Sequence, residues 1–117
     1  MSAAMQPPHD KHSHRLNARK VAKLYGLSLA ACARAIGFTP ENLRSHPDAI
    51  KAQGPLAQLV HAWNVLSEIF PGEGAAQKWL HHPNRRLQGQ TPMQLLQARG
   101  LPAFTGLIGE LDEGYYA

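Results

Sequence analysis

Several features that define common protein classes are absent from this sequence of 117 residues. No apolar run approaches the roughly 20 residues of a membrane span, and the N-terminus lacks the apolar stretch of a secretory signal. The single cysteine, Cys32, excludes an intramolecular disulfide. The sequence contains no glycine-rich phosphate loop, no cysteine–histidine metal frame and no nucleophile with a paired base. We therefore expect a cytoplasmic protein that is not an enzyme and uses no metal or cofactor.

Strand signals are also missing. Valine and isoleucine are scarce, and no stretch alternates apolar with polar residues. Hydrophobic residues nevertheless make up 44% of the chain and charged residues 17%, which is enough apolar surface for a folded core. Helical spacing recurs from residue 17 onward, so the predicted fold class is all-α.

The charge of +4 is concentrated in the first half of the chain. Residues 1–51 contain eight Lys or Arg and three acids, whereas residues 52–117 contain four basic residues and five acids. This asymmetry favours different partners for the two halves, with a basic solvated face as the alternative.

The first 14 residues contain Pro7, Pro8 and three histidines but no apolar periodicity. His9, His12 and His14 lack the fixed frame of a zinc site, so we predict a disordered tail at 1–14. Cys32 lies among alanines in a helical pattern, which indicates a small buried residue.

Residues 15–53 predict a helix-turn-helix. A first helix follows Asn17 and ends at Gly26, a second runs from Ser28 to Ile36, and a third follows Gly37 and runs from Pro40 to Ser45. Ser28 and Thr39 are the expected N-caps. The predicted DNA-binding residues are Arg34, Thr39, Glu41, Asn42, Arg44 and Ser45. The alternative is a hairpin used only for packing, because Pro47 cuts the recognition helix short.

Residues 54–117 predict further helices. Leu56, Leu59, Val60, Trp63, Leu66 and Phe70 form an apolar stripe on a helix at about 55–70. A short helix at 74–81 places Ala75 and Trp79 on one side, and Thr91 with Gln94 forms a capping box. Gly100 and Pro102 separate that helix from a last one, which carries Phe104, Leu107, Ile108 and Leu111.

The most distinctive segment runs from Trp79 to Leu96 and reads WLHHPNRRLQGQTPMQLL. It resembles the signature of the Xre/MbcA/ParS toxin-binding domain, closely over residues 55–117 and more loosely over the helix-turn-helix. Much of the motif has structural roles in the core, in a turn and in a loop. The structural residues are Trp79, Leu80, Pro83, Asn84, Leu87, Gly89 and Pro92. We expect Trp79 and Leu87 to belong to the core rather than to an interface, and His81-His82 to close a helix C-terminus.

The resemblance implies an antitoxin whose partner is a RES-domain toxin that degrades NAD. It further implies that the C-terminal end enters the toxin's substrate cleft, where two tyrosines would bury a large area and acidic residues would pair with a basic entrance. The residues assigned to toxin binding are Arg85, Glu110, Glu113, Gly114, Tyr115, Tyr116 and Ala117. The alternatives are a C-terminus folded back on its own core, and a solvated Arg85-Arg86 pair.

The basic half then predicts operator binding, with a homodimer inside a hetero-oligomeric toxin–antitoxin complex and no membrane partner. A stand-alone helix-turn-helix repressor is the alternative function. The short recognition helix leaves open that DNA binding is weak or lost.

Overall fold

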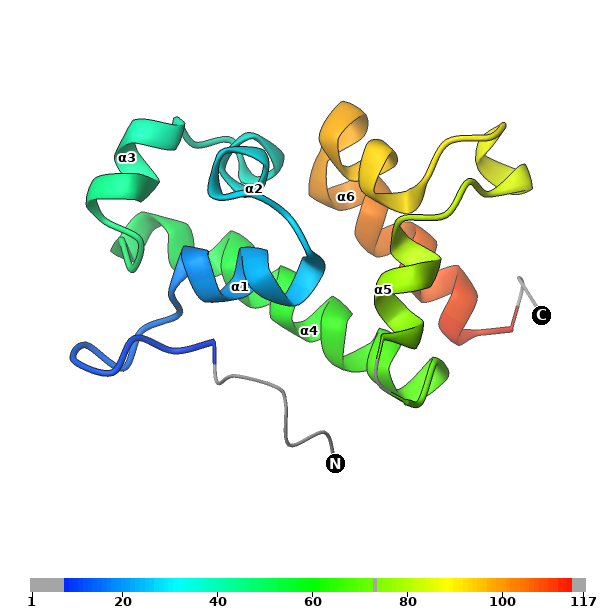
Figure 1. Ribbon diagram of the computed structural model, residues 1–117, viewed down its shortest axis with the longest axis horizontal. Helices are drawn as coiled ribbons and strands as arrows, with labels where there is room; N and C mark the ends of the chain where they lie inside the picture. The colour runs from blue at the N-terminus through cyan, green and yellow to red at the C-terminus, as the bar shows by residue number, and fades with distance from the viewer. Residues whose placement is uncertain (1–7, 73, 115–117) are drawn as a thin grey trace.

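The computed structural model describes residues 8–72 and 74–114, and the regular secondary structure of this part of the chain is helical (Figure 1). It contains no strand, only one isolated bridge between His9 and Leu16, so the all-α prediction is confirmed. The elements are α1 (Ala18–Tyr25), α2 (Leu29–Ile36), α3 (Pro40–Ser45), the 3-10 turn η1 (Ile50–Ala52), α4 (Gln53–Ile69), α5 (Ala75–Leu80), the 3-10 turn η2 (Arg85–Leu87) and α6 (Pro92–Asp112).

The first three helices begin at the predicted caps. The side chains of Asn17, Ser28 and Thr39 each accept a backbone N–H from the first turn that follows. Gly26 and Gly37 end α1 and α2 in the left-handed conformation, with φ of 68° and 81°. Local side-chain chemistry therefore sets these boundaries.

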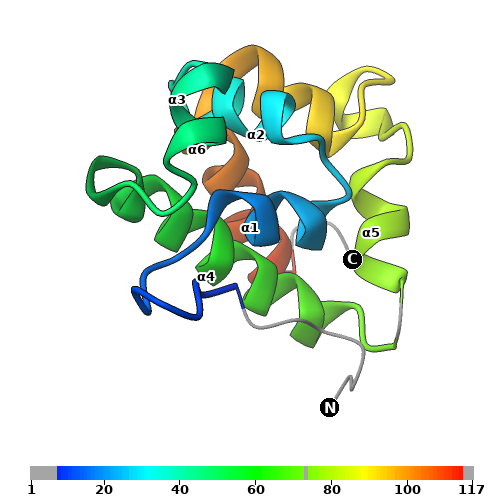
Figure 2. The same ribbon diagram turned by 60° about the vertical axis from the view of Figure 1, so that its left-hand side comes forward.

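Helix α4 crosses the middle of the molecule, and both α1 and α6 pack against it (Figures 1 and 2). Its buried face is close to the predicted stripe, since Leu56, Leu59 and Leu66 are fully buried and Trp63 is 8% exposed. Val60 and Phe70 are only partly buried. Phe70 follows the last helical residue, so its ring reaches the edge of the core rather than its centre.

Tyr25 joins the two halves of the chain at the centre of the core. Its hydroxyl donates to the Leu59 carbonyl at 2.6 Å. Its ring meets Trp63 and Phe104 edge-on, with centroid distances of 5.4 and 5.9 Å. Residues 15–53 and the region after residue 54 thus share one hydrophobic core.

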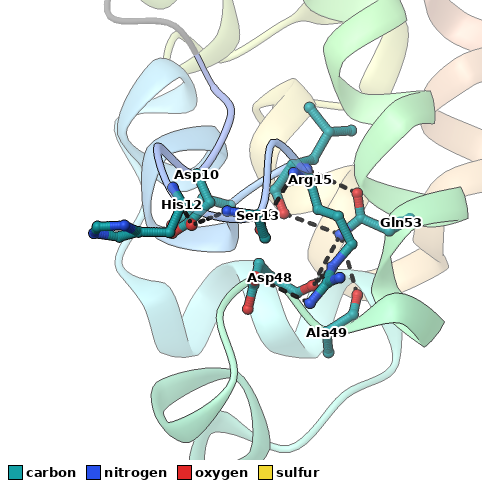
Figure 3. Close-up of polar contacts among 9 residues, drawn as sticks. Asp10, His12, Ser13, Arg15, Asp48, Ala49 and Gln53 are labelled. Atoms are coloured by element: carbon teal, nitrogen blue, oxygen red, sulfur yellow. Dashed lines mark hydrogen bonds and ion pairs between the residues drawn. The ribbon is translucent and has the colours of Figure 1, made fainter.

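Residues 8–14 differ from the predicted disordered tail. Asp10 accepts the backbone N–H groups of His12 and Ser13, both at 2.9 Å, and so closes a tight turn (Figure 3). The Lys20 ammonium reaches the His9 carbonyl at 2.8 Å. Because backbone and side-chain bonds tie this turn to α1, it is part of the folded structure from residue 8 onward.

The turn leads into a polar junction at the start of α4. Arg15 donates to the backbone and the carboxylate of Asp48, at 2.9 and 3.1 Å (Figure 3). The Gln53 amide bonds to both the N–H and the carbonyl of Leu16. This junction holds the chain before α1 against the entry to α4.

Helices α5 and α6 depart from prediction in detail. The buried face of α5 is formed by Ala76 and Leu80, not by Ala75 and Trp79. The predicted break at Gly100 is present as a kink, because its φ of 82° and ψ of −175° interrupt helical geometry within α6. None of the helices in the described ranges has the length and apolar character needed to cross a membrane.

Candidate functional site

The helix-turn-helix region is closely packed where its last two helices meet. Ala33 and Leu43 are fully buried where α2 and α3 meet, and Ile36 is 9% exposed. A Cβ on Gly37 would meet nothing within 4 Å, so this glycine is needed for its positive φ and not for space.

The predicted DNA-binding side chains all face solvent. Arg34, Glu41 and Arg44 are exposed, as are Thr39, Asn42 and Ser45. We call these six residues the recognition face. The Thr39 hydroxyl already accepts the Asn42 N–H at 3.2 Å, so part of its hydrogen-bonding capacity is used in capping α3. Arg44 and Asn42 remain the side chains best suited to base edges or phosphates.

Sequence analysis missed a role for Arg19. Its guanidinium, projecting from α1, donates to the Arg44 carbonyl at 3.2 Å. This bond supports the last turn of α3, a helix of only six residues. In the sequence, Arg19 was visible only as part of the basic excess of the N-terminal half. Its contact with α3 could not be predicted, because the pairing of α1 with α3 depends on tertiary structure.

The predicted structural motif occupies α5, η2 and the start of α6. Leu80 and Pro92 are buried, and Thr91 with Gln94 forms the full capping box. Trp79 and Leu87 are only half-buried. The Trp79 ring stacks on Phe70 with a centroid distance of 5.6 Å. Trp79 therefore packs against the edge of the core, whereas Leu87 is not among the residues packed against it.

Asn84 organises the loop between α5 and α6. Its side chain accepts the Arg86 N–H at 2.9 Å, and its carbonyl accepts the N–H groups of Leu87 and Gly89, both at 3.0 Å. Gly89 has φ of 88°, a conformation that glycine adopts without strain. The loop is closed on itself and leaves Arg85 and Arg86 exposed.

Two side chains of α5 contact the C-terminal carbonyls of α1, although the two helices are far apart in the sequence. Gln77 Nε2 donates to the Leu24 carbonyl at 2.7 Å, and His81 Nε2 lies 2.7 Å from the Tyr25 carbonyl. His81 does sit at a helix C-terminus, as predicted, but it is the C-terminus of α1 that its ring contacts. A Cβ on Gly26 would lie 3.2 Å from His81 Nε2, so glycine also permits this approach.

The residues assigned to toxin binding do not form one cluster. Glu110, Glu113 and Gly114 are exposed at the end of α6. Tyr115, Tyr116 and Ala117 lie outside the described residues. Arg85 belongs to η2, which Figure 1 shows well separated from the end of α6. The same view places α3 at the opposite end of the longest axis, whose extent is 40 Å.

Two grooves lie on the C-terminal half. A wide one of about 500 Å³ is bordered by Leu27, His81 and the first turns of α6, including Gln94 and Gln97. Gln97 also donates to the Ala31 carbonyl of α2 at 2.9 Å. A smaller groove of about 140 Å³ lies between α4 and the last turns of α6. Sequence periodicity contained no sign of either, since both depend on helix pairing.

Nothing in the described ranges is arranged for metal binding: residues 8–72 and 74–114 contain no group of three or more His, Cys, Asp or Glu that could hold an ion. Cys32 is fully buried, as expected, and burial raises the pKa of its thiol to about 11. A thiol with this pKa contains very little thiolate at neutral pH, so Cys32 is a packing residue.

Comparison with known proteins connects this architecture to one family. Residues 66–107 match the family described as the antitoxin Xre/MbcA/ParS C-terminal toxin-binding domain. The chain is 29% identical over 73 residues to the antitoxin Xre of Pseudomonas putida, which is 62% of this chain and 46% of that relative. The match thus spans less than half of the relative's length.

The fold is also found in a solved structure. One chain of the crystal structure of the M. tuberculosis MbcT-MbcA toxin-antitoxin complex superposes with a TM-score of 0.54 and 19% sequence identity, over 86% of this chain and 94% of that one. The family match at residues 66–107 confirms the resemblance stated from the motif at Trp79–Leu96, and this superposition shows that the fold is shared. The matched segment begins in α4 and contains α5, η2 and most of α6.

Proposed function

We propose that this chain, whose residues 66–107 carry an Xre/MbcA/ParS-type toxin-binding domain, is the antitoxin of a toxin–antitoxin pair. It blocks its toxin by binding and performs no catalysis itself. By the family resemblance, the toxin is of the RES type and degrades NAD. The family match supports this proposal most directly, because it covers the segment that builds the C-terminal half.

The geometry supports the end of α6 as the blocking element. Helix α6 is held by the core through Leu107 and Ile108, which are 5% and 3% exposed, while Glu110 and Glu113 on the following turn are exposed. A rigid helix therefore presents an acidic terminus. Such a terminus suits an active site that binds the phosphates of NAD through basic groups.

The test is co-expression with the toxin encoded beside this gene, with bacterial growth and cellular NAD as readouts. The full chain should restore both, whereas a chain truncated after Gly114 should restore neither, because it keeps α6 and its cap but lacks the two tyrosines. Equal rescue by the truncated chain would place inhibition elsewhere on the domain. Absence of toxicity from the neighbouring gene would contradict the proposal as a whole.

A matched control uses the opposite end of the molecule. Arg44→Ala removes an exposed side chain of the recognition face and leaves the core untouched. It should restore growth and NAD as well as the unaltered chain does. Loss of rescue in this variant would mean that α3 also takes part in toxin binding.

DNA binding is the second part of the proposal, and the solvent-exposed recognition face favours it. We propose that the complex, assembled around a homodimer of this chain, binds its own operator and represses it. Arg44→Ala should lower operator affinity by about tenfold, which corresponds to about 1.4 kcal/mol. Electrophoretic mobility shift with the promoter fragment measures this, and an unchanged affinity would argue against α3 as the reading helix.

A stand-alone repressor is the competing function, and the same helix-turn-helix geometry supports it. The two functions differ in one measurable respect. A repressor would bind the promoter without lowering the neighbouring gene product's toxicity, whereas an antitoxin must lower it.

A further inference from the structure

The chain that leaves α3 is bonded to the first turn of α1. The Ala18 N–H donates to the Pro47 carbonyl at 2.7 Å. The Arg19 guanidinium donates to the Arg44 carbonyl at 3.2 Å. These four residues form a contact that we call the α1–α3 seam. Because both bonds reach backbone carbonyls, the seam fixes the end of α3 relative to α1.

Two arginines bond to the chain at and after the end of α3, but only one of them is neutralised. Arg15 donates to the Asp48 carbonyl and also forms an ion pair with the Asp48 carboxylate, at 3.1 Å (Figure 3). The partner of Arg19 is a neutral carbonyl, and no carboxylate within residues 8–72 and 74–114 pairs with it. Arg19 is also exposed. It therefore presents an uncompensated positive charge to solvent.

The Arg19 guanidinium has donors left after its bond in the seam. A guanidinium carries five N–H groups in a planar fork, and the Arg44 carbonyl accepts from one of its nitrogens. The fork matches the oxygens of a phosphate, which accept two N–H groups side by side. Since the carbonyl bond ties the fork to the last turn of α3, Arg19 is an oriented anion-binding group beside the recognition face.

Helix α3 is too short to hold its own position on DNA. Its six residues span about 9 Å at the rise of an α-helix. In protein–DNA complexes generally, half or more of the hydrogen bonds go to phosphate and sugar, and these bonds set the register of the reading helix. A helix of six residues needs such bonds from a neighbouring element. Helix α1 is bonded directly to its end through the seam.

We propose that Arg19 binds a phosphate of the operator backbone and, through the Arg44 carbonyl, positions α3 on the DNA. The inference rests on the DNA-binding part of the proposed function and adds a residue to it. A phosphate contact is the same on every duplex, so Arg19 supplies affinity and register, while the recognition face supplies sequence preference.

The test measures binding to the promoter fragment and to a scrambled duplex of equal length. Fluorescence anisotropy follows the full chain, with and without the neighbouring gene product, between about 50 and 200 mM salt. Arg19→Gln should weaken binding to both duplexes by the same factor, up to about tenfold. It should also make the slope of log affinity against log salt concentration shallower by about 0.9, the value for one phosphate of duplex DNA. Arg19→Lys keeps the charge and should keep the slope.

A matched control removes one positive charge elsewhere. Lys78 is exposed on α5, which Figure 1 places away from α3. Lys78→Gln should change neither the affinity nor the slope, because salt screens charges that lie beyond about 10 Å from the DNA. Thermal denaturation should show the same midpoint for Arg19→Gln and the unaltered chain to within a few degrees, since the lost bond is exposed.

Four outcomes would overturn the inference. An unchanged salt slope in Arg19→Gln would exclude the phosphate contact, and a loss confined to the promoter fragment would give Arg19 a part in base reading alone. An equal change of slope in Lys78→Gln would mean that only the total charge matters. Loss of rescue from the toxin by Arg19→Gln, with DNA binding unchanged, would assign the guanidinium to a carboxylate of the toxin.

Failure of the proposed function gives a different result. If the unaltered chain binds neither duplex, with or without the neighbouring gene product, the DNA-binding part of the proposed function is contradicted and the inference falls with it. If the unaltered chain binds both duplexes and Arg19→Gln binds them equally well at every salt concentration, only the inference fails.

Discussion

The helix-turn-helix end and the C-terminal end of this molecule are held together by different kinds of interaction. In α2 and α3, Ser28 and Thr39 cap N–H groups three residues ahead. In α5, by contrast, Gln77 and His81 reach carbonyls that lie 53 and 56 residues away in the sequence. The caps of the first end are thus local bonds, although Arg19 and Gln97 also reach α3 and α2 from other helices. The C-terminal end is also bonded to α1, which lies outside the segment matched to the family.

The largest effect is expected when Tyr25, which joins the two ends of the molecule, is replaced. Tyr25→Ala should lower the free energy of unfolding by about 3–5 kcal/mol, because a buried ring and its hydrogen bond to Leu59 are lost together. Urea denaturation followed by circular dichroism measures the loss.

The control for that variant is Tyr25→Phe, which removes only the hydroxyl and should cost about 0.5–1.5 kcal/mol. Both chains should unfold in one cooperative transition, since the two halves share a core. Two separate transitions in the unaltered protein would contradict the shared core.

A second variant tests the local character of the helix-turn-helix end. Gly37→Ala forces a side chain into a positive φ of 81° and should lower the free energy of unfolding by about 1–2 kcal/mol. Gly106→Ala, at an open helical position, should be neutral or stabilising by up to about 1 kcal/mol. Thermal denaturation distinguishes the two, and equal effects would mean that Gly37 is not conformationally required.

A third comparison removes one threonine N-cap at each end of the molecule. Thr91→Ala removes the capping box of α6, and Thr39→Ala removes the cap of α3. Each should cost about 1 kcal/mol of stability. We expect only Thr39→Ala to weaken operator binding and only Thr91→Ala to weaken toxin binding, as measured by titration calorimetry. Cross-effects of equal size would show that the two ends are coupled.

The smallest effect concerns the turn at residues 8–14. The N–H groups of Ser13 and His12 lower the pKa of Asp10 below its ordinary value of 3.8. A carboxylate with a lowered pKa stabilises the folded turn above pH 4, and this contribution is lost as the pH falls through the folded-state pKa. Amide shifts of His12 and Ser13 should therefore move at acid pH, while that of Ala31, capped by the Ser28 hydroxyl, should not. Identical behaviour of all three amides would exclude a local titration.

Predictions from the sequence were correct where a feature depends on neighbouring residues and wrong where it depends on contacts between distant segments. Thr91, Pro92 and Gln94 predicted the start of α6 correctly, because a capping box is a property of four consecutive residues. The same reasoning misplaced the inner face of α5 on Ala75 and Trp79. A helix of six residues is too short for its periodicity to identify one face, and the packing of α5 against α4 and α6 decided it.

The order of helices, their caps and their glycine endings are determined within a few consecutive residues, so the residues alone predicted them. The motif at Trp79–Leu96 predicted the family resemblance for the same reason, since its turn and loop residues satisfy local backbone requirements. Tertiary structure decided the capping of α1 by Gln77 and His81, the support of α3 by Arg19 and the groove between α4 and the end of α6. Each of these depends on which helices meet, and helix pairing is set by the packing of the whole core around Tyr25.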